Sequence, residues 1–137
     1  MNKDKLKEIY TKYQLDKEDI FMLKFGGVDK PIICRSGIEK IQAQLGIKVN
    51  FKIEKISEDF KSCIIIANGA ILSTNNEGKG MATNMAQSFG EASPANTKSN
   101  FPICMAEKRA LGRVVLKMAN IFGVHSEDEA EDFKKNG

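Results

Sequence analysis

Three consecutive segments with the pattern of β-strands, at 48–56, 62–72 and 81–91, constrain the fold more than any other feature of this sequence. In the first segment, apolar and polar residues alternate from Val49 to Glu54, as in a half-buried antiparallel strand. The second segment is apolar and rich in β-branched residues, and turn-forming residues separate the three segments. The sequence therefore predicts a three-stranded antiparallel meander.

The part of the chain before the meander has the pattern of a helix followed by a hairpin. Apolar residues at helical spacing predict a short amphipathic helix over 3–13. Gly26 and Gly27 predict a turn, which strands at 20–25 and 32–35 would flank.

A second helix is expected over 37–45, between the hairpin and the meander. Ser36 is its candidate N-cap, and Glu39 at the third helical position completes a capping box. Gly46 follows the last apolar residue of the segment and is expected to end the helix as a C-cap.

The longest helix is predicted after the meander and a polar loop. It begins at Ser99 or Asn100, and Pro102 lies in its first turn, where a missing N–H costs nothing. It runs to about Phe122, with Gly123 as its C-cap. A second capping box, from Ser126 to Glu129, predicts a short acidic helix that ends near residue 133.

This order of elements predicts one α+β domain, with a three-stranded antiparallel meander plus an N-terminal hairpin and a long C-terminal helix packed on the sheet. The length of 137 residues fits a single domain. We divide it into an N-terminal helix and hairpin (1–35), a core (36–123) and an acidic C-terminal helix or tail (124–137). A charged N-terminus and the absence of a long apolar run lead us to expect a cytoplasmic protein without membrane association.

The cysteine and histidine content argues against most catalytic classes. Cys34, Cys63 and Cys104 are odd in number, form no CxxC pair and each lie among apolar neighbours, which is typical of buried cysteines in a reducing compartment. His125 is the only histidine. The sequence therefore has no closely spaced pairs of Cys or His ligands for zinc, and nothing around His125 indicates that it activates a catalytic serine or cysteine. We therefore expect no enzymatic activity, no metal and no cofactor.

The charged residues are unevenly distributed, although the net charge is only +3. The segment 101–117 is basic and contains Glu107 as its one acidic residue, whereas the segment 126–133 is acidic and contains no base. A basic helix indicates an anionic partner. The acidic tail could compete with that partner for the basic helix, or the tail could stay solvated.

The basic side chains of the long helix form a stripe. Arg109, Arg113 and Lys117 follow the spacing i, i+4, i+8, with about 6 Å between neighbours along the axis. That distance is close to the phosphate spacing of a stretched nucleic-acid strand, ~6–7 Å. The alternative interpretation is the solvated face of an ordinary amphipathic helix.

The opposite arc of the helix is apolar and is expected to pack on the sheet. Glu107 projects toward this arc, where an unpaired carboxylate would be costly. We expect Glu107 to form an ion pair with a base such as Arg35 or Lys108, or else to be exposed.

The order of helix, meander and long basic helix resembles the single-strand-annealing recombinases. These include the phage Erf, RecT and Red-beta groups and the eukaryotic recombination mediator of the Rad fifty-two type. The most telling segments are 89–92 (FGEA), 105–110 (MAEKRA) and 116–123, which are similar to a pattern in small proteins of phages and mobile elements. The resemblance covers roughly residues 36–133.

The resemblance implies a ring or filament of subunits that takes part in DNA recombination and repair. In such an assembly the sheet and long helix line a basic groove, which holds single-stranded DNA by its backbone and leaves the bases exposed for strand annealing. Carried over to this chain, the residues of that groove would be Lys108, Arg109, Arg113, Lys117, Lys48, Lys52, Lys55 and Lys79.

Two other functions stay open. An α-β-β-β-α order is also similar to double-stranded RNA-binding domains, so the chain could be a module for duplex RNA or DNA. It could instead be a structural oligomerisation protein, in which the basic stripe of one subunit contacts the acidic tail of its neighbour.

Overall fold

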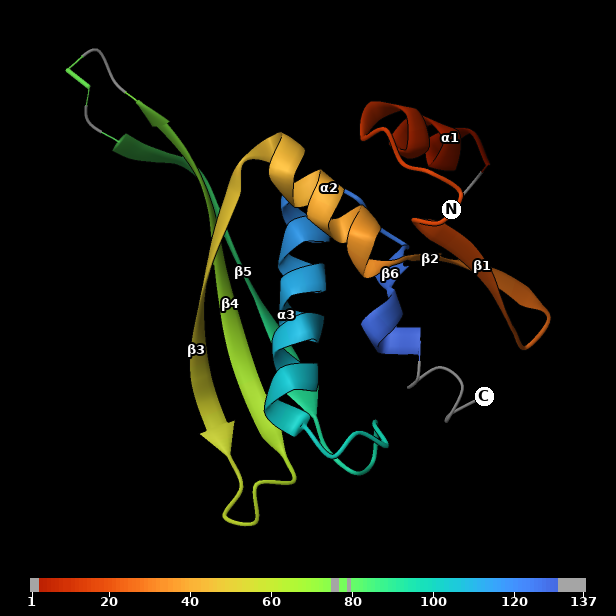
Figure 1. The fold of residues 1–137 in the computed structure, drawn as a ribbon, viewed down its shortest axis with the longest axis vertical. Helices are drawn as coiled ribbons and strands as arrows, with labels where there is room; N and C mark the ends of the chain where they lie inside the picture. The colour runs from red at the N-terminus through yellow and green to blue at the C-terminus, as the bar shows by residue number, and fades with distance from the viewer. Residues whose placement is uncertain (1–2, 75–76, 79, 131–137) are drawn as a thin grey trace.

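The structure, a computed structural model, describes residues 3–74, 77–78 and 80–130 and contains two three-stranded sheets (Figure 1). The elements in chain order are α1 (Lys3–Lys12), β1 (Ile20–Phe25), β2 (Val28–Ile33), α2 (Arg35–Leu45), β3 (Ile47–Ile56), β4 (Cys63–Thr74), β5 (Gly80–Ala92), α3 (Pro102–Met118), β6 (His125–Ser126) and the 3₁₀ turn η1 (Glu127–Glu129). The predicted α+β class is confirmed, because α3 packs on an antiparallel meander and a hairpin precedes α2. No helix in these described ranges is long and apolar enough to cross a membrane.

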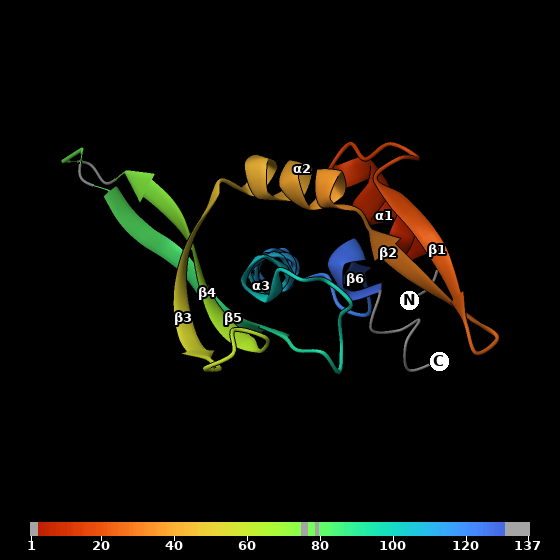
Figure 2. The same ribbon diagram turned by 60° about the horizontal axis from the view of Figure 1, so that its bottom comes forward.

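The large sheet has the strand order β3-β4-β5, and both of its pairings are antiparallel. Figure 2, which looks along α3, shows this sheet on one side of the helix and β1 and β2 on the other. One sheet face therefore packs on α3, whereas the opposite face, which we call the outer sheet face, points away from that helix.

Small residues bring α3 close to the large sheet. Ala106 and Ala110 are fully buried on the packed side of the helix. They face Gly90 of β5, where an added Cβ atom would lie 1.9 Å from the carbonyl oxygen of Ala106. At Gly69 of β4, an added Cβ atom would lie 2.6 Å from the sulfur atom of Met118 and 3.2 Å from a methyl group of Val114. The helix thus contacts the sheet through positions where a larger side chain would not fit.

The second sheet joins the two ends of the described chain. Its order is β1-β2-β6: the predicted hairpin forms β1 and β2, and β2 also pairs in parallel with β6. Ile32 lies opposite His125, so the segment that follows α3 is anchored to the N-terminal hairpin. This pairing was not predicted, because a two-residue strand has no recognisable pattern.

The predicted start of α2 is wrong. The helix begins at Arg35, and its N-cap is Cys34, with no side-chain cap. Ser36 instead donates a hydrogen bond to the carboxylate of Asp19 (2.6 Å), so no capping box forms. The predicted C-cap is confirmed, since Gly46 adopts a left-handed φ of 67°.

The long helix and the acidic helix are both shorter than predicted. α3 ends at Met118, because Asn120 adopts a left-handed φ of 57° that a continuing helix does not allow. The predicted acidic helix is a single 3₁₀ turn over Glu127–Glu129 within the described chain, and its predicted remainder, 131–133, lies outside the described residues.

Candidate nucleic-acid interface

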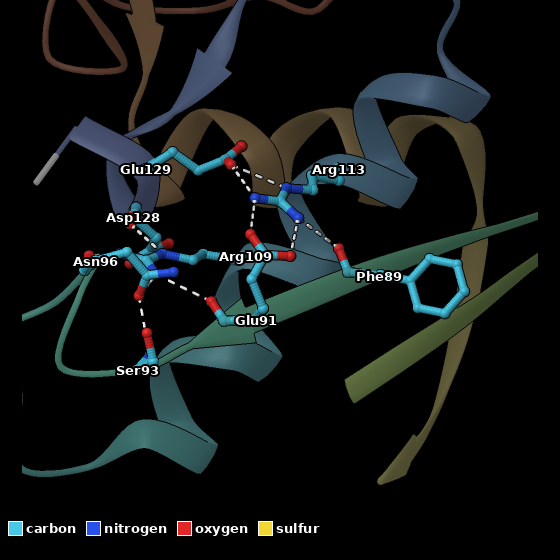
Figure 3. Close-up of polar contacts among 8 residues, drawn as sticks. All are labelled: Phe89, Glu91, Ser93, Asn96, Arg109, Arg113, Asp128 and Glu129. Carbon is cyan, nitrogen blue, oxygen red and sulfur yellow. Dashed lines mark hydrogen bonds and ion pairs between the residues drawn. The ribbon is translucent and has the colours of Figure 1, made fainter. Parts of the chain in front are cut away.

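The basic stripe of α3 lies along the free edge of β5, where its side chains bind backbone carbonyl groups. Figure 3 shows this arrangement for Arg109 and Arg113. The donors and their carbonyl acceptors are Arg109 Nη1 and Glu91 (3.0 Å), Arg113 Nη1 and Phe89 (2.9 Å), and Lys117 Nζ and Gln87 (2.9 Å). Donors four residues apart on a helix are about 6 Å apart, and acceptors two residues apart on a strand are about 6.6 Å apart. The spacing of the basic side chains, which is close to the phosphate spacing of a nucleic acid, thus also matches the spacing of carbonyl groups along the edge of a β-strand.

Arg109 is a core residue, with only 1% of its surface exposed. Besides its bond to Glu91, its guanidinium donates to the carbonyl oxygen of Asp128 (2.9 Å) and to both the carbonyl oxygen (2.8 Å) and the side-chain oxygen (2.9 Å) of Asn96. These four bonds connect α3 to β5, to the loop before α3 and to η1. The expectation of a surface stripe is therefore wrong for Arg109, which is not accessible to a DNA phosphate.

Arg113 is held between two carboxylates. It forms ion pairs with Glu91 (2.8 Å) on β5 and with Glu129 on η1. The hydrogen bonds that Arg113 donates to Glu91 raise the pKa of Arg113 above its ordinary value; burial opposes this, and the hydrogen bonds donated to Glu129 add to it. The same contact with Arg113 lowers the pKa of Glu91. The positive charge of Arg113 is thus balanced inside the chain.

The acidic segment contacts the bases of its own chain. Besides the pair between Glu129 and Arg113, Asp128 forms an ion pair with Arg35 (3.2 Å), and the Glu127 carboxylate accepts a hydrogen bond from the backbone N–H of Arg35 (2.7 Å). Within the described residues, 127–129 are therefore neither a free tail nor a solvated one.

Glu107 and Lys108 do not form the expected ion pair. Glu107 is exposed, which confirms the second of the two predicted alternatives, whereas its predicted position in the apolar arc is wrong. The buried residues nearest to it on α3 are Ala106, Arg109 and Ala110. Lys108 is half-buried beside Arg35 in a small hollow between α2 and α3. Of the three cysteines that were expected to be buried, only Cys63 is; Cys34 is half-buried and Cys104 is exposed.

The lysines of β3 lie on the outer sheet face. Gly69 of β4 faces α3, so the alternate residues Ala70, Ile66 and Ile64 point away from that helix. The strand register places Lys48, Lys52 and Lys55 opposite those three residues, in the same order. All three lysines are exposed, and none forms a hydrogen bond or ion pair within 3–74, 77–78 and 80–130.

Amide side chains cross the outer sheet face between Lys48 and Lys52. The register aligns Asn50, Asn68 and Gln87 in one row over β3, β4 and β5, and Gln87 donates a hydrogen bond to Asn68 (3.1 Å). Lys48 and these amides line a shallow groove, together with Leu72 and Met85. Cations with neutral amide donors suit the phosphates and sugars of a nucleic acid without reading its bases.

The structure does not bring the predicted residues into one groove. Arg109, Arg113 and Lys117 lie at the β5 edge, and Lys108 lies between α2 and α3. The lysine row lies on the far side of the sheet at β3. Lys79 lies outside the described residues. The amides of the outer sheet face were missed, although the alternation that predicted the meander also places them beside the lysines.

No protein-family model and no curated protein sequence matches this chain. The resemblance to annealing recombinases therefore supplies an expectation about function. Among the described residues, carboxylates balance the charge of Arg113, whereas the lysine row of β3 has no ion-pair partner.

Proposed function

We propose that this protein binds single-stranded DNA through its outer sheet face and promotes strand annealing, without covalent catalysis. The observation that carries the proposal is the row formed by Lys48, Lys52 and Lys55, which has no partner within the described chain. The three bases of the α3 stripe, Arg109, Arg113 and Lys117, by contrast, bind acceptors of the same chain. We further infer that the protein acts in the cytoplasm, in recombination of phage or mobile-element DNA.

The geometry of the lysine row favours one strand over a duplex. Lys48 and Lys52 are four residues apart on β3, about 13 Å, which corresponds to about two phosphate intervals of an extended strand. A single row of cations matches one sugar–phosphate backbone, whereas a duplex presents two. A strand bound by its backbone leaves its bases available for pairing with a complementary strand.

The proposal is tested by fluorescence anisotropy of a labelled, mixed-sequence single strand at low and moderate salt, with unlabelled duplex as competitor. We expect binding that weakens steeply with salt, because phosphate contacts release counterions, and that duplex does not displace. An annealing assay with two complementary strands then measures the activity itself. Absence of binding at low salt would contradict the proposal.

A second candidate function is assembly of subunits, and the apolar part of the outer sheet face favours it. Met85 (71% exposed), Leu72 and Phe89 all lie uncovered on β4 and β5. A ring or filament of copies would bury such residues. Sedimentation analysis with and without single-stranded DNA distinguishes a protein that only assembles from one that binds DNA.

A further inference from the structure

Two exposed phenylalanines line one pocket at the end of the large sheet. Phe60 (66% exposed) belongs to the loop between β3 and β4, and Phe101 (72% exposed) immediately precedes α3. Pro102 and Ile103 complete the apolar part of the pocket. Neither ring is buried in the core of the protein, so core packing does not explain why phenylalanine stands at these two positions.

The loop around Phe60 is fixed by its polar residues rather than by the ring. Asp59 accepts hydrogen bonds from the hydroxyl of Ser57 (2.6 Å) and from the N–H of Lys61 (3.0 Å). The N–H of Phe60 donates to the carbonyl oxygen of Ser57 (3.0 Å), and Phe60 has a left-handed φ of 59°. The backbone therefore presents the ring to solvent while the loop keeps its shape.

The pocket has a polar side formed by Asn100 and Glu107. Glu107 is exposed and has no hydrogen bond or ion pair among the residues that the structure describes. A carboxylate accepts hydrogen bonds and donates none, so it suits a ligand with an N–H group. Apolar walls with a few polar groups are typical of a site for a flat heteroaromatic ring.

Basic residues adjoin the pocket. A neighbouring hollow shares Phe60, Asn100 and Pro102 with it and is also lined by Lys61, Lys98 and Asp59. The lysine row of β3 ends at Lys55, just before the loop that carries Phe60. The lysines beside the pocket thus complement an anionic chain that carries aromatic bases.

We propose that the pocket holds one unstacked base of the DNA strand, a proposal that rests on the function proposed above. The faces of Phe60 and Phe101 contact the base, and Glu107 accepts a hydrogen bond from its exocyclic amino group. Lys61 contacts the adjoining phosphate. Thymine has no amino group, and its one N–H lies between two carbonyl oxygens that the carboxylate repels, so oligo-dC binds more tightly than oligo-dT of the same length.

The test is the anisotropy of labelled oligo-dC and oligo-dT with the full chain and its variants. We expect the double variant Phe60→Ala/Phe101→Ala to bind oligo-dC about tenfold more weakly, with an unchanged salt slope, because stacking involves no counterions. We expect Glu107→Ala to equalise the affinities for the two oligomers. The matched control is Phe21→Ala/Phe122→Ala, which removes two exposed rings elsewhere and keeps the wild-type affinity.

The failures of the two proposals are distinguishable. A wild-type chain that binds neither oligomer at low salt overturns the function itself. A double variant that keeps the wild-type melting temperature and affinity overturns only the base pocket. A wild-type oligomer that dissociates in the double variant with unchanged DNA affinity also overturns it, since the pocket then holds a second copy of the chain.

Discussion

At the residue scale, Arg109 shows why a charge pattern does not reveal exposure. Arg109 shares a helical stripe with Arg113 and Lys117. Arg109 is nevertheless buried, whereas Arg113 is half-buried and Lys117 is exposed. Its acceptors belong to Glu91, Asn96 and Asp128, which are distant in the sequence. No local pattern around position 109 could therefore predict its burial.

Substitution of Arg109 by lysine is expected to lower the free energy of unfolding by about 3 kcal/mol. One ammonium group cannot replace the four directed donors of the guanidinium, so buried carbonyl groups lose their partners. Urea denaturation measures the loss. The matched control, Arg35→Lys, alters a half-exposed ion pair and should cost less than about 1 kcal/mol. Equal effects of the two substitutions would show that the bonds of Arg109 are not important for stability.

Asp19 makes the stability of the protein depend on pH. Burial raises the pKa of this carboxyl, but hydrogen bonds from the N–H of Asp16 and from Lys40 and Ser36 outweigh it, so the pKa falls to about 2 from 3.8. The folded state thus prefers the ionised form of Asp19. The resulting stabilisation is fully present above pH 3.8 and is lost as the pH falls through about 2.

We therefore expect Asp19→Asn to destabilise the chain relative to the wild type at neutral pH. The difference should shrink as the pH falls from about 4 to about 2, because the wild-type carboxyl then becomes protonated. Urea denaturation of both chains across that range measures it. A difference that does not change with pH would contradict the assigned cause.

At the scale of elements, the sequence predicts what is local and misses what is tertiary. The meander and the long helix were predicted from periodicity, and the hairpin from the turn signal at Gly26 and Gly27. The C-cap at Gly46 was predicted because this glycine follows the last apolar residue of a helical segment. The parallel pairing of β6 with β2 and the contact of α3 with the β5 edge depend on residues far apart in the chain. The lysines of β3 were predicted as site residues, but the sequence placed them in one groove with the bases of α3. They lie on the opposite face of the sheet because the helix packs on the other face.

The close approach of α3 to β5 gives a prediction about Gly90. We expect Gly90→Ala to lower the free energy of unfolding by about 3 kcal/mol, because the new Cβ atom would lie 1.9 Å from a backbone oxygen of α3. Gly80 is the control on the same strand, since nothing lies within 4 Å of a Cβ atom there. Thermal denaturation of the two variants should show a large loss only for Gly90→Ala. Similar melting temperatures would show that the helix moves away from β5 at little cost.

At the scale of the whole molecule, the position of the charges matters more than the net charge of +3. The three bases of the α3 stripe stabilise the fold: they bind the free edge of β5, and Arg113 also binds the acidic segment that follows β6. Binding at that edge also blocks pairing of β5 with another strand. The row of exposed lysines on β3 lies on the outer sheet face, on the opposite side of the sheet.

The central claim is tested most directly by comparing two triple-lysine variants in the anisotropy assay with single-stranded DNA. Lys48→Ala/Lys52→Ala/Lys55→Ala removes the row on β3, and Lys7→Ala/Lys17→Ala/Lys24→Ala removes three exposed lysines elsewhere, so both lose the same charge. We expect the first variant to bind at least about tenfold more weakly, with a salt slope smaller by about 2, and the second to bind nearly as the wild type does. Equal losses in the two variants would contradict the claim, because binding would then depend on net charge and not on the outer sheet face.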